Sequence, residues 1–162
     1  MAYAADEAQA GNGGRCVVTF HRDGSVSVSD DGRGTATFRD DRGRVMKKPV
    51  MSTKDLRFFD SPDAQRLPDG HPRRGISVVA ALSEWLIHTN RRQDGAWTQR
   101  YEHGMPVTGL VPIPNSGATG TTVHFHPSAI VRTRSTSAVI DPAQLAASWR
   151  QLSIEVHHEQ DA

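Results

Sequence analysis

The sequence predicts an α+β fold: a two-layer sandwich in which helices cover one face of a mixed, mostly antiparallel sheet. Two observations carry this prediction. Asp-Gly turns at residues 23–24 and 94–95 each join two strand-like segments into a hairpin. Helix-like segments precede, separate and follow these hairpins. The chain has 162 residues, of which 36% are hydrophobic, so it can form one domain with a buried core.

The composition argues against several classes of protein. A net charge of +1 disfavours a dedicated nucleic-acid-binding domain, and no apolar run reaches the length of a membrane span. The single cysteine, Cys16, cannot form an internal disulfide, which fits a cytoplasmic setting. It lies in an apolar segment, so we expect it to be a small buried hydrophobe. Residues 1–10 lack the apolar stretch of a signal peptide.

The first elements are predicted by local pattern. Residues 3–10 favour a helix, which the glycine-rich residues 11–14 would end. Strands are expected at 15–21 and 25–30. In the second strand Val26 and Val28 alternate with serines. Because Asp30 continues the valine stripe, its carboxylate is expected on the apolar face, at the end of the strand.

The later elements are predicted in the same way. Residues 31–72 are irregular, with one helix candidate near 49–58, and 60–74 is expected to be a polar loop. The remaining expected elements are a helix at 74–83, strands at 85–92 and 96–102, a loop at 106–120, a strand at 121–126, a helix at 142–152 and a polar tail at 156–162.

Two interpretations of residues 30–34 are open. Asp and Gly are turn residues, and a turn after a strand is the simpler one. However, a carboxylate on the core face needs a hydrogen-bond donor, which a ligand amine or a water could supply. Gly32 and Gly34 would let the backbone pass close to a flat ligand. Thr121 is expected on the inner face of its strand, where its hydroxyl also needs a partner.

Two further segments have possible ligand chemistry. His124 and His126 share a face of one strand and could bind a metal, but no third ligand is convincingly spaced, so we predict no metal site. Residues 69–75 lead into a helix N-terminus and contain two arginines, which could hold a phosphate. An exposed basic loop is the commoner meaning of such a segment.

Four segments together resemble the ATPase domains of the DNA gyrase B-subunit family, within the GHKL group of ATPases with the Bergerat fold. Residues 6–11 resemble the end of the first pocket helix, and 25–34 the adenine-binding strand and turn. Residues 75–83, followed by the Tyr-Glu-His-Gly of 101–104, resemble the helix after the ATP lid. Residues 119–125 resemble the family's Thr-Gly-Thr strand. The resemblance covers roughly residues 4–130.

The resemblance implies roles for individual residues. Asp30 would accept a hydrogen bond from the adenine amino group, directly and through water, and Thr121 would join this network. Val28 would touch the base and Gly34 would shape the pocket floor. The other residues implied at the site are Gly32, Arg33 on the rim paired with Glu7, Gly70 and Gly75 of the lid, and Arg92, which corresponds to a rim arginine that contacts aminocoumarin inhibitors.

The sequence also departs from the family's pattern. Tyr3 stands where the family has its magnesium-binding asparagine, and a phenol is a poor ligand for Mg²⁺. The position of the catalytic glutamate would fall before Met1. In the lid, residues 71–74 replace the family's glycine-rich sequence, and Pro72 removes a backbone donor. We therefore predict no catalytic residues and doubt a role for magnesium.

These patterns lead to one functional expectation and one alternative. Residues 1–155 are expected to form a single truncated GHKL-type domain that binds ATP or ADP weakly and is impaired in hydrolysis, with 156–162 as a tail. The alternative is a non-catalytic module that pairs with gyrase subunits or captures an aminocoumarin. The expected protein is cytoplasmic and monomeric, without direct contact to DNA or membrane.

Overall fold

The computed structural model describes residues 1–11, 13–35, 38–39, 41–42, 45–46, 66–134 and 141–159. In chain order the elements are α1 (Ala2–Gly11), β1 (Gly14–Phe20), β2 (Val26–Asp30), β3 (Phe38–Arg39), β4 (Val45–Met46), α2 (Ile76–Ala81), β5 (Ser83–Arg92), β6 (Gly95–Glu102), β7 (Met105–Pro106), β8 (Val111–Pro112), β9 (Gly120–Pro127), α3 (Ala129–Arg134), α4 (Pro142–Ser148) and β10 (Leu152–His158).

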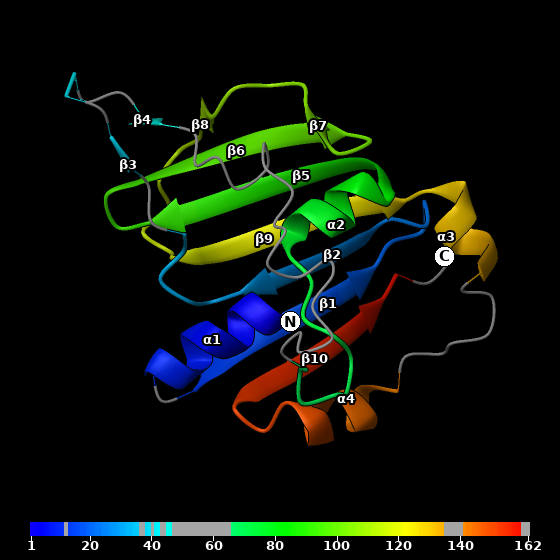
Figure 1. The fold of residues 1–162 in the computed structure, drawn as a ribbon. Helices are drawn as coiled ribbons and strands as arrows, with labels where there is room; N and C mark the ends of the chain where they lie inside the picture. The colour runs from blue at the N-terminus through cyan, green and yellow to red at the C-terminus, as the bar shows by residue number, and fades with distance from the viewer. Residues whose placement is uncertain are drawn as a thin grey trace.

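Eight strands form one sheet in the order β10-β1-β2-β9-β5-β6-β7, with β8 also paired to β6. All neighbours in this sheet are antiparallel except β1 and β10, which are parallel. Figure 1 shows α1 and α2 on the same face of the sheet. The predicted α+β architecture, with helices on a mixed and mostly antiparallel sheet, is confirmed.

Helix α1 packs on the sheet through small residues. Ala4 and Ala8, one turn apart, are buried and contact the cluster that contains Cys16 of β1. After the helix the N–H of Gly13 donates to the carbonyl of Ala8 at 2.8 Å, and Gly13 has a φ of +127°. The helix therefore ends at Gly11, where the glycines predict its end.

The alternation in β2 places Asp30 under α1. Val28 lies opposite Val18 of β1, and Asp30 lies opposite Cys16. Cross-strand partners share a face, and both Val18 and Cys16 are buried. Asp30 thus lies on the helix-covered face, as the valine stripe predicts, and Cys16 is the buried hydrophobe that was expected.

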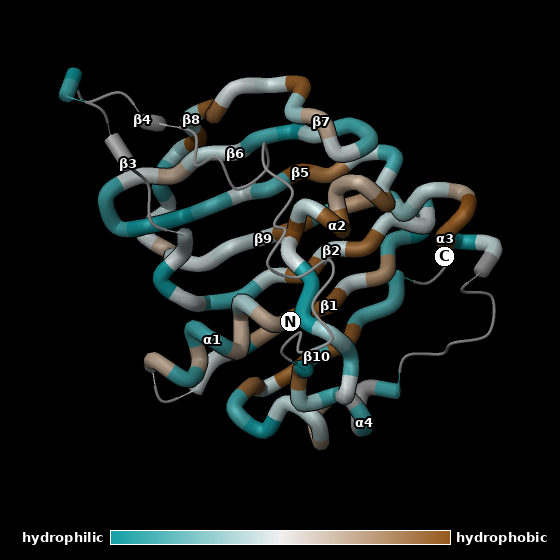
Figure 2. The backbone as a smooth tube through the Cα atoms, viewed as in Figure 1, coloured by the Kyte–Doolittle hydropathy of each residue, from teal (hydrophilic) through white to brown (hydrophobic). Residues whose placement is uncertain are grey.

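Two clusters form the core. One joins α1, β1, Trp149 and Leu152, and the other joins α2 with Leu86 and Tyr101 of the β5–β6 hairpin. Figure 2 shows hydrophobic residues along the strands and α2, and hydrophilic residues at the β5–β6 turn. Among the described residues, no helix is long and apolar enough to cross a membrane.

The C-terminal region differs from the prediction. The helix expected at 142–152 ends at Ser148, and β10 follows at Leu152–His158. Residues 156–158 are therefore part of a strand rather than a polar tail. The physical reason is the alternation of Leu152, Ile154 and Val156, whose partners on β1 are Gly14, Cys16 and Val18. This stripe completes the core below α1.

Two smaller differences concern element bounds. The helix expected at 74–83 is limited to Ile76–Ala81 because β5 already begins at Ser83. The loop expected at 106–120 contains β8, which pairs with β6. The helix candidate at 49–58 lies outside the described residues.

Candidate adenine-nucleotide site

Asp30, at the end of β2, is the chemical centre of the candidate site. Its Oδ1 accepts a hydrogen bond from the N–H of Gly32 at 3.0 Å, and the N–H of Thr121 is a second backbone donor to this carboxylate. Burial raises the pKa of Asp30, and these two hydrogen bonds oppose the rise. A carboxylate has about four lone-pair sites, so acceptor capacity remains for a ligand that donates an N–H.

Thr121 reaches Asp30 because β9 runs beside β2. The preceding residue, Gly120, has a φ of +133° and lies directly against the backbone of Asp30. A Cβ atom at position 120 would overlap the carbonyl oxygen of Asp30 and lie 3.0 Å from its carbonyl carbon. Glycine at this position therefore allows the close approach that brings the Thr121 N–H to the carboxylate.

Glu7 and Arg33 form the rim between α1 and the β2 loop. The Arg33 Nε donates to Glu7 Oε2 at 2.9 Å and its Nη2 donates to Oε1 at 3.1 Å. This hydrogen bonding lowers the pKa of Glu7. A Cβ at Gly32 would lie 3.0 Å from the Glu7 Cβ, so Gly32 lets the loop pass under the helix. The ion pair that the resemblance implies is present.

Gly34 and Arg92 fix the same loop to β5. Gly34 has a φ of +74°, and a Cβ there would overlap the carbonyl oxygen of Arg91. Arg92 Nη1 donates to the Gly34 carbonyl at 2.8 Å. The fully buried Asn90 accepts from the Thr35 N–H at 2.6 Å and donates to the Thr35 carbonyl at 3.1 Å. The loop after Asp30 is thus held in one conformation.

The two predicted lid glycines flank a segment that contacts α1. Gly70, with a φ of +81°, is in a tight turn in which its N–H donates to the Leu67 carbonyl at 2.8 Å. Gly75 precedes α2, and a Cβ at this position would lie 3.8 Å from the Tyr3 hydroxyl. Between them Arg73 forms an ion pair with Asp6. This segment is therefore attached to α1.

A cleft of about 460 Å³ is lined in part by this segment, and Asp30 is not among its lining residues. Its wall includes Asp6 and Arg73, together with Arg66, Trp149 and Arg150. The indole Nε1 of Trp149 is buried without a hydrogen-bond partner among the described residues. None of the residues predicted to contact adenine lines this cleft. We place the candidate site at Asp30 instead, because the unfilled acceptor sites of its carboxylate call for a ligand that donates an N–H.

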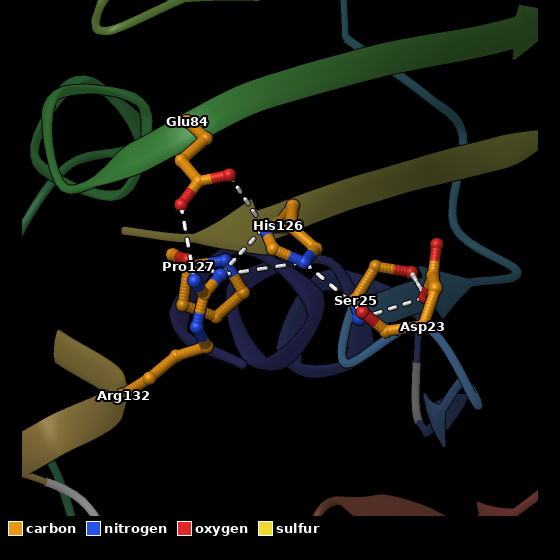
Figure 3. Close-up of polar contacts among 6 residues, drawn as sticks. All are labelled: Asp23, Ser25, Glu84, His126, Pro127 and Arg132. Atoms are coloured by element: carbon orange, nitrogen blue, oxygen red, sulfur yellow. Dashed lines mark hydrogen bonds and ion pairs between the residues drawn. The ribbon is translucent and has the colours of Figure 1, made fainter. Parts of the chain in front are cut away.

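A second polar network lies at the other end of β9 from Thr121 (Figure 3). Glu84 Oε2 is 3.1 Å from His126 Nδ1, and Glu84 Oε1 is 3.2 Å from Arg132 Nη2, so this network links α3 to β5. Nearby, Ser25 Oγ is 2.8 Å from His124 Nε2. Among the described residues, no group of three or more His, Cys, Asp or Glu is arranged to hold a metal.

Two residues and one contact of the site region were not predicted from the sequence. Asn90 falls on the same face as Leu86 by simple alternation, and a polar residue in that stripe was the available signal. Gly120 belongs to the Thr-Gly-Thr motif, but its close approach to the backbone of Asp30 was not predicted. The Arg73–Asp6 contact has no local signal, because the two residues are far apart in the chain.

Comparison with curated proteins identifies the relatives of this chain. It is 37% identical over 123 residues, 75% of the chain, to the B subunit of DNA topoisomerase 4 from Bacillus subtilis. It is 38% identical over 127 residues, 78% of the chain, to the B subunit of DNA gyrase from Thermotoga maritima. It is 34% identical over 160 residues, 93% of the chain, to the mitochondrial DNA gyrase B subunit of Arabidopsis thaliana. No family model matches.

The match covers most of this chain but a small part of each relative. The chain spans 19%, 20% and 21% of the length of these three proteins. The alignment over 93% of the chain extends beyond residue 130, the limit of the motif resemblance. The chain is thus homologous to the N-terminal ATPase region of the B subunits of type IIA DNA topoisomerases, gyrase and topoisomerase 4.

Proposed function

We propose that this chain is an adenine-nucleotide-binding domain that takes ATP or ADP at Asp30. The observation that carries the proposal is the half-buried Asp30 carboxylate, which has two backbone donors and no side-chain cation bonded to it among the described residues. An exocyclic amino group would fill its remaining acceptor sites, directly and through water. Homology to ATPase regions supports the same ligand.

The neighbouring residues have defined parts in this proposal. Val28, on the Asp30 face of β2, would contact the base. Gly32 and Gly34 would leave room for the ring, and the Thr121 N–H holds the carboxylate in place. Glu7 and Arg33 would border the site. Gly70 and Gly75 would lie toward the phosphates, although the Gly70 N–H is already donated to Leu67.

The residues present do not fit a magnesium ion. Tyr3, at the position where the resemblance places a metal-binding asparagine, has a phenol instead of a compact oxygen ligand. The nearest carboxylate on the same helix, Asp6, is already paired with the Arg73 guanidinium. Phosphoryl transfer depends on a metal and on positioning, so we propose that hydrolysis is impaired.

Calorimetric titration with ADP tests this proposal. We expect weak binding by the wild-type chain and a decrease of about 30-fold or more in affinity for Asp30→Asn, because a hydrogen bond to a charged acceptor is worth roughly 2 kcal/mol. Asp31→Asn is the matched control. Asp31 is exposed, and its Oδ1 accepts from the Arg15 N–H at 2.8 Å, which an amide oxygen can also do. Absence of wild-type binding at millimolar ADP contradicts the proposal.

A second candidate function is a non-catalytic module that pairs with gyrase subunits or captures an aminocoumarin. The observation that favours it is the exposed Arg33 side chain, at 74% exposure, on the same loop that Arg92 holds. Thermal melting with an aminocoumarin separates the two functions. A shift in the wild-type chain that is lost in Arg33→Gln, without binding of ADP, favours the module.

A further inference from the structure

We infer that the guanidinium of Arg73, in place of a divalent cation, provides the positive charge for the phosphates of the bound nucleotide. This inference rests on the proposed function, since it needs an adenine nucleotide at Asp30. It adds a residue from the segment between Gly70 and Gly75 to the site. It also explains how a domain without fitting magnesium ligands could still prefer a nucleotide over a nucleoside.

The position of Arg73 is fixed by two contacts on α1. Its Nη1 donates to Asp6 Oδ1 at 3.2 Å, and its Nη2 pairs with Asp6 Oδ2. Its Cζ lies 5.6 Å from the centroid of the Tyr3 ring, within the range of a cation–π contact. Tyr3 and Asp6 are three residues apart and so lie on one side of the helix. The guanidinium is therefore held over the first turn of α1.

This position is one helical turn away from the adenine site. A Cβ at Gly32 would lie 3.0 Å from the Glu7 Cβ, and Glu7 pairs with Arg33, whereas Tyr3 precedes Glu7 by four residues on the same helix. One turn of an α-helix rises about 5.4 Å. A nucleotide whose base meets Asp30 and which extends along α1 would therefore bring its phosphates toward the side of the helix that Arg73 occupies.

Arg73 is suited to this role by charge and burial. The Arg73 side chain is only 16% exposed. The hydrogen bonds that it donates to Asp6 raise the pKa of the guanidinium, so Arg73 stays charged although it is largely shielded from solvent. A guanidinium binds phosphate through two parallel N–H donors. The same charge repels a divalent cation at this place.

The rival explanation is that Arg73 only fastens its segment to α1. Two substitutions separate these explanations. Arg73→Gln removes both the charge and the ion pair, whereas Asp6→Asn removes the ion pair and leaves the charge. If Arg73 only fastens its segment, both variants lose the ion pair with Asp6, and neither changes the preference for ADP over adenosine. If Arg73 binds phosphate, only Arg73→Gln loses the preference for ADP over adenosine.

The experiment measures the affinities for ADP and adenosine by calorimetry, in EDTA and in millimolar Mg²⁺. In the wild-type chain we expect ADP to bind about tenfold more tightly than adenosine, with less than a twofold effect of Mg²⁺. Arg73→Gln is expected to bind ADP and adenosine equally, with unchanged affinity for adenosine. Asp6→Asn is expected to retain the preference, and so is the control Arg150→Gln, which changes another arginine that lines the cleft.

The outcomes separate failure of this inference from failure of the proposed function. Loss of the preference in Asp6→Asn to the same extent as in Arg73→Gln overturns the inference, and so does a wild-type preference that requires Mg²⁺. In both cases adenosine still binds and the adenine site stands. If neither adenosine nor ADP binds to the wild-type chain, the proposed function fails, and the inference fails with it.

Discussion

Gly120→Ala is expected to lower the free energy of unfolding by about 3 kcal/mol, which corresponds to a fall of roughly 10 °C in melting temperature for a domain of this size. The new Cβ would overlap the backbone carbonyl of Asp30 and lie 3.3 Å from the Asp31 Cα. These are backbone atoms, which cannot move aside by rotation of a side chain. The φ of +133° adds strain for any residue with a Cβ.

Gly109→Ala is the matched control for this substitution. No atom lies within 4 Å of the Cβ that it would add, and Gly109 is not among the glycines with positive φ. We expect a change within about 0.5 kcal/mol. Thermal or urea unfolding of the two variants measures the difference. Equal stability of Gly120→Ala and Gly109→Ala would show that β9 does not approach β2 as closely as described.

The second large effect is a loss of stability at acidic pH that depends on His88. This side chain lies on the inner face of β5, with its ring 5.1 Å from that of Trp97. Burial lowers the pKa of His88 from 6.5 to about 4. As the pH falls below 6.5 the unfolded chain therefore binds a proton that the folded chain does not. Stability decreases between pH 6.5 and 4, by up to about 3 kcal/mol.

His88→Gln isolates this contribution, because it removes the titrating group. The free energy of unfolding is measured by urea at several pH values between 4 and 7. We expect the wild-type curve to fall more steeply than that of His88→Gln, while His71→Gln, at an exposed position, follows the wild-type curve. Parallel curves for the wild-type chain and His88→Gln would mean that His88 is accessible to protons in the folded state.

Elements with local signals could be predicted from the sequence. The glycines after α1 end that helix, and the Asp-Gly turns form both hairpins, because a few adjacent residues determine each feature. The position of Asp30 on the covered face also followed from alternation within a single strand. These predictions needed no knowledge of which strands lie side by side.

Features that depend on distant partners could not be predicted. Strand β10 is stabilised by parallel pairing with β1, and its polar residues, such as Glu155 and His157, made the end of the chain resemble a tail. Asn90 holds the loop after Asp30 only because the backbone of Thr35 lies next to β5, where the Asn90 side chain hydrogen-bonds to it. The ion pair of Arg73 with Asp6 also could not be predicted, because it forms only where the segment between Gly70 and Gly75 lies against α1. In each case the tertiary contact gives the residue its role.

Binding of an adenine base at Asp30 is tested most directly by an NMR titration of the ¹⁵N-labelled chain with adenosine. We expect the largest shifts of backbone amide signals at Gly32 and Thr121, whose N–H groups donate to the carboxylate, and at Gly34 in the same loop. Absence of shifts at millimolar adenosine, or shifts confined to Leu67 and Trp149 in the cleft beyond α1, would contradict it.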